Sequence, residues 1–277
     1  MYPELVRIGD FAITSFGAMM VVAFLAAYFQ AAWGMKRAGA GDADDASALV
    51  FAAGVGGIVG GKLYYAALYA DWRTLFDRAG LVWYGGMIGG ALCVMWVIRR
   101  RRLPFVGVAD AVLPGVALGY AIGRIGCFLV GDDYGLPTDS PLGVVFPQGL
   151  PPATAGTFRH EYGLEMPAAL PDDALVPVHP TQLYETTMAL AIWAVGAMML
   201  RRGARRGATA LTVAALLAVE RFVVEIFRAK DDRFFGQLTL AQVISVILLA
   251  LVAGLWWAWR RRGAARAAAA SPGGAPP

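Results

Sequence analysis

Charged side chains lie inside apolar stretches of this sequence, where such residues are rare. Arg221 and Glu225 fall four residues apart in the stretch 209–227, and Arg228 follows just beyond it. An arginine at the centre of a membrane-spanning helix costs roughly 2.5–3.5 kcal/mol on the insertion scale, so a charge there indicates a functional site. The spacing places Arg221 and Glu225 on one helical face, where they can form an ion pair that Arg228 can join. A pair that only neutralises itself within a helix bundle is the open alternative.

Arg124 ends another apolar stretch and has no such partner nearby in the sequence. Its guanidinium presents a planar fork of donors, which suits a phosphate group better than a solitary structural role. We therefore expect Arg124 to bind a phospholipid head group. Glycines throughout the segment 123–135 free the backbone to approach a ligand. Asp132 and Asp133 in the same segment are equally well explained as ordinary loop acids.

A dense run of polar residues opens a third stretch. One or two of them could be a helix cap, but that explanation does not extend to all five. They are His179, Thr181, Gln182, Tyr184 and Glu185. Two further polar residues, Lys62 and Tyr84, lie within or at the start of apolar stretches.

The composition indicates a membrane-embedded scaffold for these residues. Of 277 residues, 58% are hydrophobic and 16% are charged, against roughly 45–50% and about 25% in an average soluble domain. A disordered chain is excluded and an ordinary soluble enzyme is disfavoured. With only two His and two Cys, the sequence predicts neither a zinc cluster nor a disulfide framework. The net charge of +4 does not indicate a nucleic-acid partner, because the basic residues follow the ends of apolar stretches.

The predicted fold is an all-α integral membrane protein, a bundle of about seven transmembrane helices with a small extracytoplasmic cap. A bilayer-spanning helix needs about 20 apolar residues. The stretches that meet this need are 11–33, 47–70, 81–98, 106–127, 181–200, 209–227 and 237–259. The second is rich in glycine, which lets helix backbones approach closely, and is predicted to be a tightly packed internal helix.

Basic residues follow alternate stretches, at 36–37, 99–102, 201–206 and 260–266. The positive-inside rule then places the N-terminus outside and the C-terminus in the cytoplasm, so the charged residues described above share the outer half of the bundle. We expect residues 1–263 to form the transmembrane domain, with 128–180 as an extracytoplasmic loop or cap region. The Ala-rich segment 264–277 is predicted to be a disordered cytoplasmic tail.

These motifs make the chain resemble the bacterial phosphatidylglycerol–prolipoprotein diacylglyceryl transferase family over almost its whole length. The string 179–185, His-Pro-Thr-Gln-Leu-Tyr-Glu, is the most specific. The other matching segments are 15–17, 61–65, 84–86, 123–135 and 221–228. The sequence departs from the family pattern at five positions, where the family has Tyr, His, Asn, Asn and Glu. Here these are Phe16, Tyr84, Cys127, Val130 and Asp132.

The resemblance implies an enzyme of the bacterial cell inner membrane that performs the first step of lipoprotein maturation. It would move a diacylglyceryl group from phosphatidylglycerol onto the lipobox cysteine thiol of a prolipoprotein. Its partners would be phosphatidylglycerol, the prolipoprotein signal peptide and membrane lipids, with no cofactor, metal or nucleic acid. The implied catalytic residues are Arg124, Arg221, Glu225, His179 and Tyr84. The implied substrate-binding residues are Gly85, Gly86, Gly123, Gly126, Cys127, Asp132, Gly135, Gln182, Tyr184, Glu185 and Arg228.

This reaction needs positive charge for the leaving phosphate and a base for a thiol of pKa about 8.5. Arg124 and Arg221 would supply the charge, with Glu225 orienting Arg221. Three alternatives remain for the base. Tyr84 could act if neighbouring arginines lower its pKa from the usual value near 10, and His179 starts from about 6.5. The arginines could also stabilise the thiolate directly.

A divergent family member without transfer activity, acting as a lipid-binding or accessory membrane protein, is the second hypothesis. The changes at Tyr84, Cys127 and Val130 fit it, whereas the retained arginines argue against it. A transporter is disfavoured, since its charges would lie at mid-membrane and the sequence shows no internal repeat.

Overall fold

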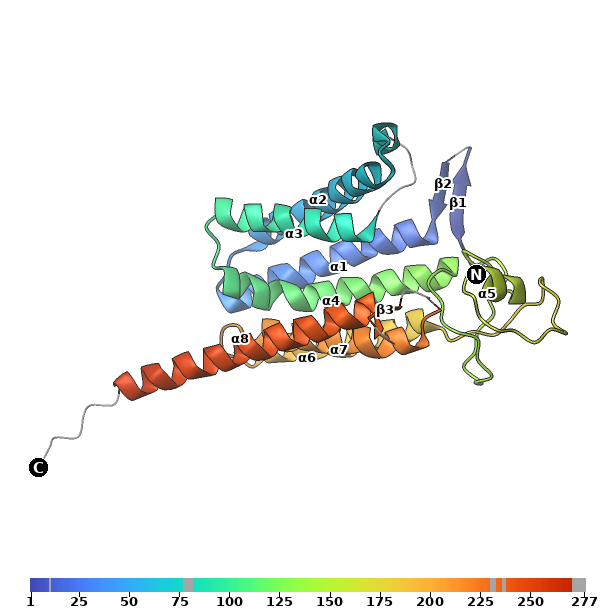
Figure 1. Cartoon of the computed structure of the whole chain (residues 1–277). Coiled ribbons are helices and arrows are strands. Elements are labelled where there is room, and N and C mark those ends of the chain that lie inside the picture. The colour runs from blue at the N-terminus through green and yellow to red at the C-terminus, as the bar shows by residue number, and fades with distance from the viewer. Residues whose placement is uncertain (10, 77–81, 230–232, 236–237, 271–277) are drawn as a thin grey trace, which may run out of the picture.

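The computed structural model describes residues 1–9, 11–76, 82–229, 233–235 and 238–270. Its long helices run alongside one another (Figure 1). They are α1 (Ser15–Ala38), α2 (Ala43–Tyr69), α3 (Trp83–Arg100), α4 (Phe105–Val130), α6 (Thr181–Arg201), α7 (Ala208–Val224) and α8 (Leu240–Ala270). The short elements are β1 (Glu4–Ile8), β2 (Phe11–Thr14), η1 (Trp72–Phe76), α5 (Ala155–His160), η2 (Glu225–Phe227), β3 (Arg233–Phe235) and β4 (Leu238–Thr239). Within each pair, β1 with β2 and β3 with β4, the strands are antiparallel.

Five helices within the described ranges, α1, α2, α4, α6 and α8, are long and apolar enough to cross a membrane. The predicted class, an all-α membrane protein, is therefore confirmed. The shorter helices α3 and α7, of 18 and 17 residues, fall outside that set. The number of about seven spans stays a prediction.

The helix ends differ from the predicted stretches for local reasons. α1 starts at Ser15 because the preceding residues form β2, and the Thr14 side chain caps the helix by accepting from the Gly17 amide. α8 continues to Ala270, seven residues into the segment expected to be disordered. Alanine has the highest helix propensity, which favours this continuation. The remainder of that segment, 271–277, lies outside the described residues.

α2 and α3 pack against each other through facing glycines. A Cβ on Gly60 would collide with the backbone of Gly85, and one on Gly56 would lie 2.5 Å from the Gly89 carbonyl oxygen. Another face of α2 is open, as Phe51 shows with 73% of its surface exposed, although Leu49 near the start of the helix is buried. The prediction of an internal helix is therefore wrong, although that of tight packing is right. In a bilayer, apolar side chains such as Phe51 can face lipid tails at no cost.

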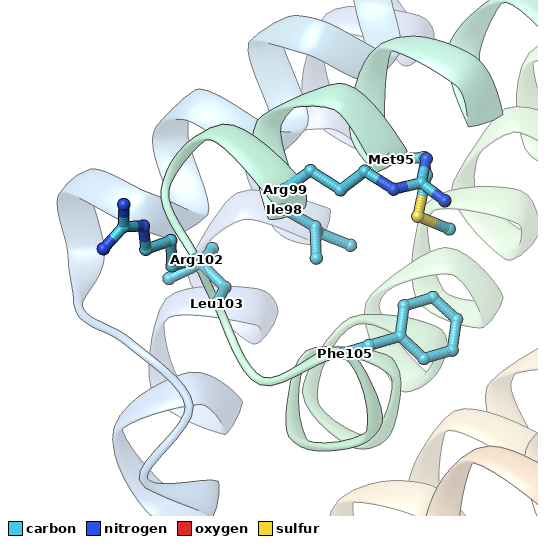
Figure 2. Close-up of a pocket in the computed structure, with 6 residues that line it drawn as sticks. All are labelled: Met95, Ile98, Arg99, Arg102, Leu103 and Phe105. Carbon is cyan, nitrogen blue, oxygen red and sulfur yellow. The ribbon is translucent and has the colours of Figure 1, made fainter.

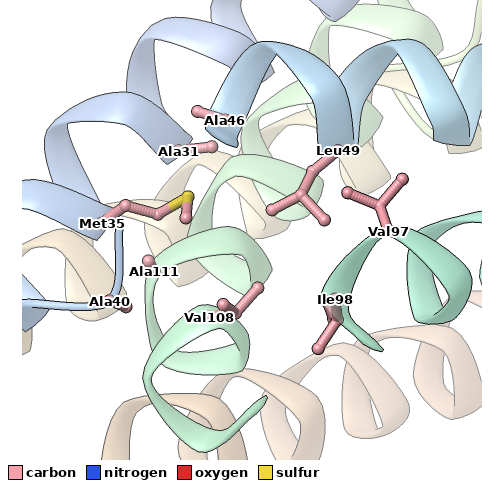
Figure 3. Packing of buried hydrophobic residues seen from close by; sticks show 9 residues of the cluster. All are labelled: Ala31, Met35, Ala40, Ala46, Leu49, Val97, Ile98, Val108 and Ala111. Carbon is pink, nitrogen blue, oxygen red and sulfur yellow. The ribbon is translucent and has the colours of Figure 1, made fainter. Parts of the chain in front are cut away.

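α1 and α4 form the centre of the bundle, and a buried apolar cluster ties them to α2 and α3 at one end (Figure 3). Met35 of α1 lies there beside Leu49 of α2, Val97 of α3 and Ala111 of α4. Outside this cluster, a surface pocket of about 480 Å³ lies between the end of α3 and the start of α4 (Figure 2). Met95, Ile98, Arg99, Arg102, Leu103 and Phe105 line it.

The opposite end of the bundle carries the 131–180 region, defined as the segment that connects α4 to α6. It lies beyond the end of α4 together with α5 (Figure 1). Tyr134, Phe146, Phe158 and Val178 form a buried cluster within it. This region therefore contains a buried apolar cluster, which Ala229 from beyond α7 also joins.

Candidate active site

Charged side chains from several elements meet where the bundle joins the 131–180 region. α4 packs against both α6 and α7, which brings the last turns of α4 beside the first turn of α6 and the end of α7. The charged cluster, defined here, consists of Arg124 from α4, Asp133 from the loop after it, Glu185 from α6, Arg221 from α7, Glu225 from η2 and Arg228.

Glu185 lies at the centre of the charged cluster, with no exposed side-chain surface. It forms an ion pair with Arg124, and its Oε1 accepts from Arg228 Nη1 at 3.4 Å. The Tyr120 hydroxyl donates to the same oxygen at 2.9 Å, and Arg221 Nη1 lies 3.9 Å away. A buried carboxylate needs such partners because desolvation otherwise makes it costly. Glu185 therefore fixes the positions of the arginines.

Asp133 bridges Arg124 and Arg228 from the other side. Its Oδ2 lies 3.0 Å from Arg124 Nη1, and its Oδ1 lies 2.6 Å from Arg228 Nη2. The side chain is 41% exposed, in contrast to that of Glu185. Its backbone is held in the left-handed region at φ +57°, where Asp is tolerated better than most residues. Its carbonyl accepts from Thr181 Oγ1 at 2.9 Å.

The structure gives Arg124 and Asp133 partners that the sequence left open. Arg124 has close acidic partners, although Glu185 is distant in the sequence. Asp133 is an ion-pair partner and not an ordinary loop acid. The acidic pair eight and nine residues after Arg124 was the available signal, but it could not show that Asp133 turns back toward α4.

The predicted ion pair between Arg221 and Glu225 is confirmed at 2.7 Å. Arg228 joins it more loosely, with its Nε 3.7 Å from Glu225 Oε2. The Glu225 side chain is fully buried, whereas Arg221 is 30% exposed. Glu225 can therefore hold one side of the Arg221 guanidinium while the rest stays accessible.

The charged cluster is balanced, since its three arginines face three carboxylates. Two further acids lie close by. Glu220 of α7, which the sequence reading missed, is 1% exposed, and its Oε1 has no hydrogen-bond partner among the residues that the structure describes. Asp132 is partly buried, and this burial raises the pKa of its carboxyl. The cluster therefore presents no excess positive charge.

The remaining polar candidates lie around the charged cluster at different distances. Cys127 Sγ is 3.5 Å from Arg124 Nη1, and Gln182 donates to the Asp132 carbonyl at 2.6 Å. His179 Nδ1 hydrogen-bonds with the Tyr184 hydroxyl at 3.1 Å.

Two candidates lie apart from the charged cluster. Tyr84 sits on α3, is 38% exposed, and touches Trp83 edge-on. Within the described ranges, it has no hydrogen bond or ion pair with the charged cluster. Lys62 donates to the Thr74 carbonyl in η1 at 3.5 Å.

A family model described as prolipoprotein diacylglyceryl transferase matches residues 3–258. The chain belongs to this family. The resemblance inferred from its motifs is thereby confirmed over nearly the whole chain.

Proteins named phosphatidylglycerol–prolipoprotein diacylglyceryl transferase are similar along most of their length. One from Geobacter sulfurreducens is 30% identical over 260 residues, which cover 88% of this chain and 89% of that protein. One from Pseudomonas fluorescens is 29% identical over 274 residues, 94% of each. One from Vibrio cholerae is 29% identical over 273 residues, 94% of this chain and 92% of that protein.

Position 132 is one of the places where this chain departs from the family pattern. The family pattern places a glutamate at position 132. Here the shorter Asp132 stands there, and the neighbouring Asp133 makes the ion pairs with the arginines.

The glycines of the transferase motifs occupy close contacts within the protein. Gly85 and Gly86 face α2, and Gly126 faces α1, where a Cβ would lie 3.1 Å from that of Met19. A Cβ on Gly135 would collide with the Phe227 carbonyl, whereas one on Gly123 would meet only Met20, at 3.8 Å. Among these positions, Gly123 has the most open surroundings. A role in substrate binding for all five stays a prediction.

Proposed function

We propose that this chain transfers a diacylglyceryl group from phosphatidylglycerol to the lipobox cysteine thiol of prolipoproteins. The observation that carries the proposal is the charged cluster, in which buried carboxylates hold three arginines at one end of a membrane-embedded bundle. Its Arg221 and Asp133 side chains reach the surface, where a lipid head group could meet them. Family membership supplies the reaction class.

In this reaction the cysteine sulfur attacks the glycerol carbon that bears the phosphoester. A carbon–sulfur bond forms, the carbon–oxygen bond breaks, and glycerol phosphate leaves with the electron pair. The arginines stabilise the phosphate as its negative charge increases, and one well-placed electrostatic group of this kind contributes about 10²–10³ in rate. Glu185 and Glu225 keep the guanidinium groups in place.

The thiol proton needs an acceptor. The balanced charge of the cluster argues against thiolate stabilisation by the arginines alone. We assign the proton to His179: when its Nδ1 donates to Tyr184, its Nε2 is free to accept. Tyr84 is the second candidate, because it lies on α3 and, among the residues that the structure describes, forms no hydrogen bond or ion pair with the charged cluster.

We further propose seven membrane spans, with the charged cluster and the 131–180 region outside the cytoplasm. A reporter that is active only outside the cytoplasm should then work when fused within 140–170 and fail when fused after Arg102 or Arg206. The reverse pattern would contradict this orientation. The cytoplasmic end would carry the tail that begins at residue 264.

Purified protein supplied with phosphatidylglycerol and a lipobox peptide tests the activity. We expect a thioether-linked diacylglyceryl peptide and free glycerol phosphate, and a peptide with Ser in place of the cysteine should give neither. If an active relative forms product under the same conditions and this chain does not, a lipid-binding accessory role becomes the better explanation.

A further inference from the structure

Arg124 and Arg228 are each held between an inner and an outer carboxylate. Glu185 contacts both from the inside and is fully buried, whereas Asp133 contacts both from the outside and is 41% exposed. The inner carboxylate is fixed by Tyr120 as well as by the arginines. The outer one lies on a loop, so the two carboxylates differ in how readily they can leave.

We propose that Asp133 is a displaceable internal anion that occupies the position of the lipid phosphate between Arg124 and Arg228. The proposal rests on the proposed function, because it names the group that receives the phosphate of the lipid donor. It assigns the phosphate to Arg124 and Arg228, whereas the sequence pointed to Arg124 and Arg221. The Asp133 carboxylate moves into solvent when the lipid binds.

The chemistry of the two anions supports this exchange. A phosphodiester carries one negative charge on two free oxygens, as a carboxylate does, and arginine binds both anions through paired N–H donors. One oxygen of Asp133 now faces Arg124 and the other faces Arg228. A phosphodiester in this position would face the same two guanidinium groups and leave the total charge of the cluster unchanged.

The loop geometry permits the exchange without unfolding. The Asp133 carbonyl accepts a hydrogen bond from Thr181, and the amide of the next glycine, Gly135, donates to the His179 carbonyl. Only the Asp133 side chain has to turn outward, and its 41% exposure shows that solvent already reaches it. Rotation of a single side chain toward water is a small and fast motion.

While Asp133 occupies the site, a lipid phosphate cannot bind there. The apparent affinity for the lipid is therefore the intrinsic affinity multiplied by the fraction of molecules in which the site is open. A tenfold change in affinity corresponds to about 1.4 kcal/mol. Asp133→Asn removes the competing charge and keeps the side-chain shape. We therefore expect Asp133→Asn to bind phosphatidylglycerol about tenfold more tightly than the unmodified protein.

The test measures the thermal shift of purified protein titrated with short-chain phosphatidylglycerol, so that it does not depend on turnover. Inorganic phosphate and diacylglycerol of the same chain length form separate arms. They distinguish a lipid phosphate from free phosphate and from apolar contact. Asp139→Asn is the matched control, since Asp139 is an exposed acid of the same region. Asp133→Ser serves as a second neutral variant.

Tighter binding of phosphatidylglycerol in both Asp133 variants, with Asp139→Asn unchanged, would support the proposal. Equal or weaker binding would overturn it, as would tighter binding of diacylglycerol or of inorganic phosphate alone. Loss of folded protein in both Asp133 variants would also overturn it, since a carboxylate that leaves the site cannot be required for folding. Tighter lipid binding in a protein without transfer activity would retain this inference and reject the proposed function.

Discussion

Replacing Glu185 with glutamine should disable the site without changing its size. Glu185 Oε2 faces Arg124, and Oε1 accepts from both Tyr120 and Arg228. An amide has one oxygen and one NH₂ group, so in either orientation the NH₂ faces a donor. Removing one partner of a buried ion pair destabilises a protein by about 3–5 kcal/mol, because the remaining charge stays buried. We expect a loss of this size in Glu185→Gln.

The rate of transfer should fall as well, since a displacement of about 1 Å in a catalytic group costs on the order of 100-fold. Turnover with phosphatidylglycerol and a lipobox peptide, measured beside thermal unfolding in the same detergent, gives both quantities. Glu165→Gln makes the same chemical change at an exposed position of the 131–180 region and should alter neither. Glu185→Gln protein with turnover and unfolding temperature near those of the unmodified protein would refute the organising role of Glu185.

Three further predictions concern other parts of the protein. Gly60→Leu should destabilise the α2–α3 pair by about 1–3 kcal/mol or more. Gly254→Leu, at a position with open space, should not. Equal thermal unfolding of the two variants would reject the packing argument. Arg124→Lys should lose about 10²–10³ in turnover while staying folded, because the ammonium of lysine is a compact point charge without the planar fork of donors that a guanidinium offers. Near-normal turnover would exclude the phosphate role. His179→Ala should lower turnover severely when made alone and less when combined with Tyr84→His. Equal losses of turnover in both backgrounds would exclude a shared base role.

Local spacing predicted those parts of the site that lie within one helical segment. The pair of Arg221 and Glu225 follows from four-residue spacing, which is a property of the helix itself. Arg124 and Glu185 are 61 residues apart and meet only because α4 packs against α6. No local pattern contains that contact, so the sequence identified both residues without pairing them.

The glycines of this chain have two explanations that the sequence does not separate. A glycine that frees the backbone for a ligand and one that admits a neighbouring helix look alike in the sequence. Gly85 was expected to bind substrate, and the structure places it against Gly60 of α2. The glycines of α2 indicated close packing correctly, but they could not show that another face of that helix, which carries Phe51, is open.

The order of the charged partners along the chain bears on how the protein enters the membrane during synthesis. α4 carries Arg124 and is completed long before α6 brings Glu185. At roughly 5–20 residues per second, the 52 positions from Asp133 to Glu185 take roughly 3–10 s to synthesise. During this interval Asp133, only nine residues after Arg124, is the nearer acid that can neutralise it. Asp132 lies one residue closer to Arg124 still, so two acids are near Arg124 during this interval and insertion of α4 does not depend on Asp133 alone.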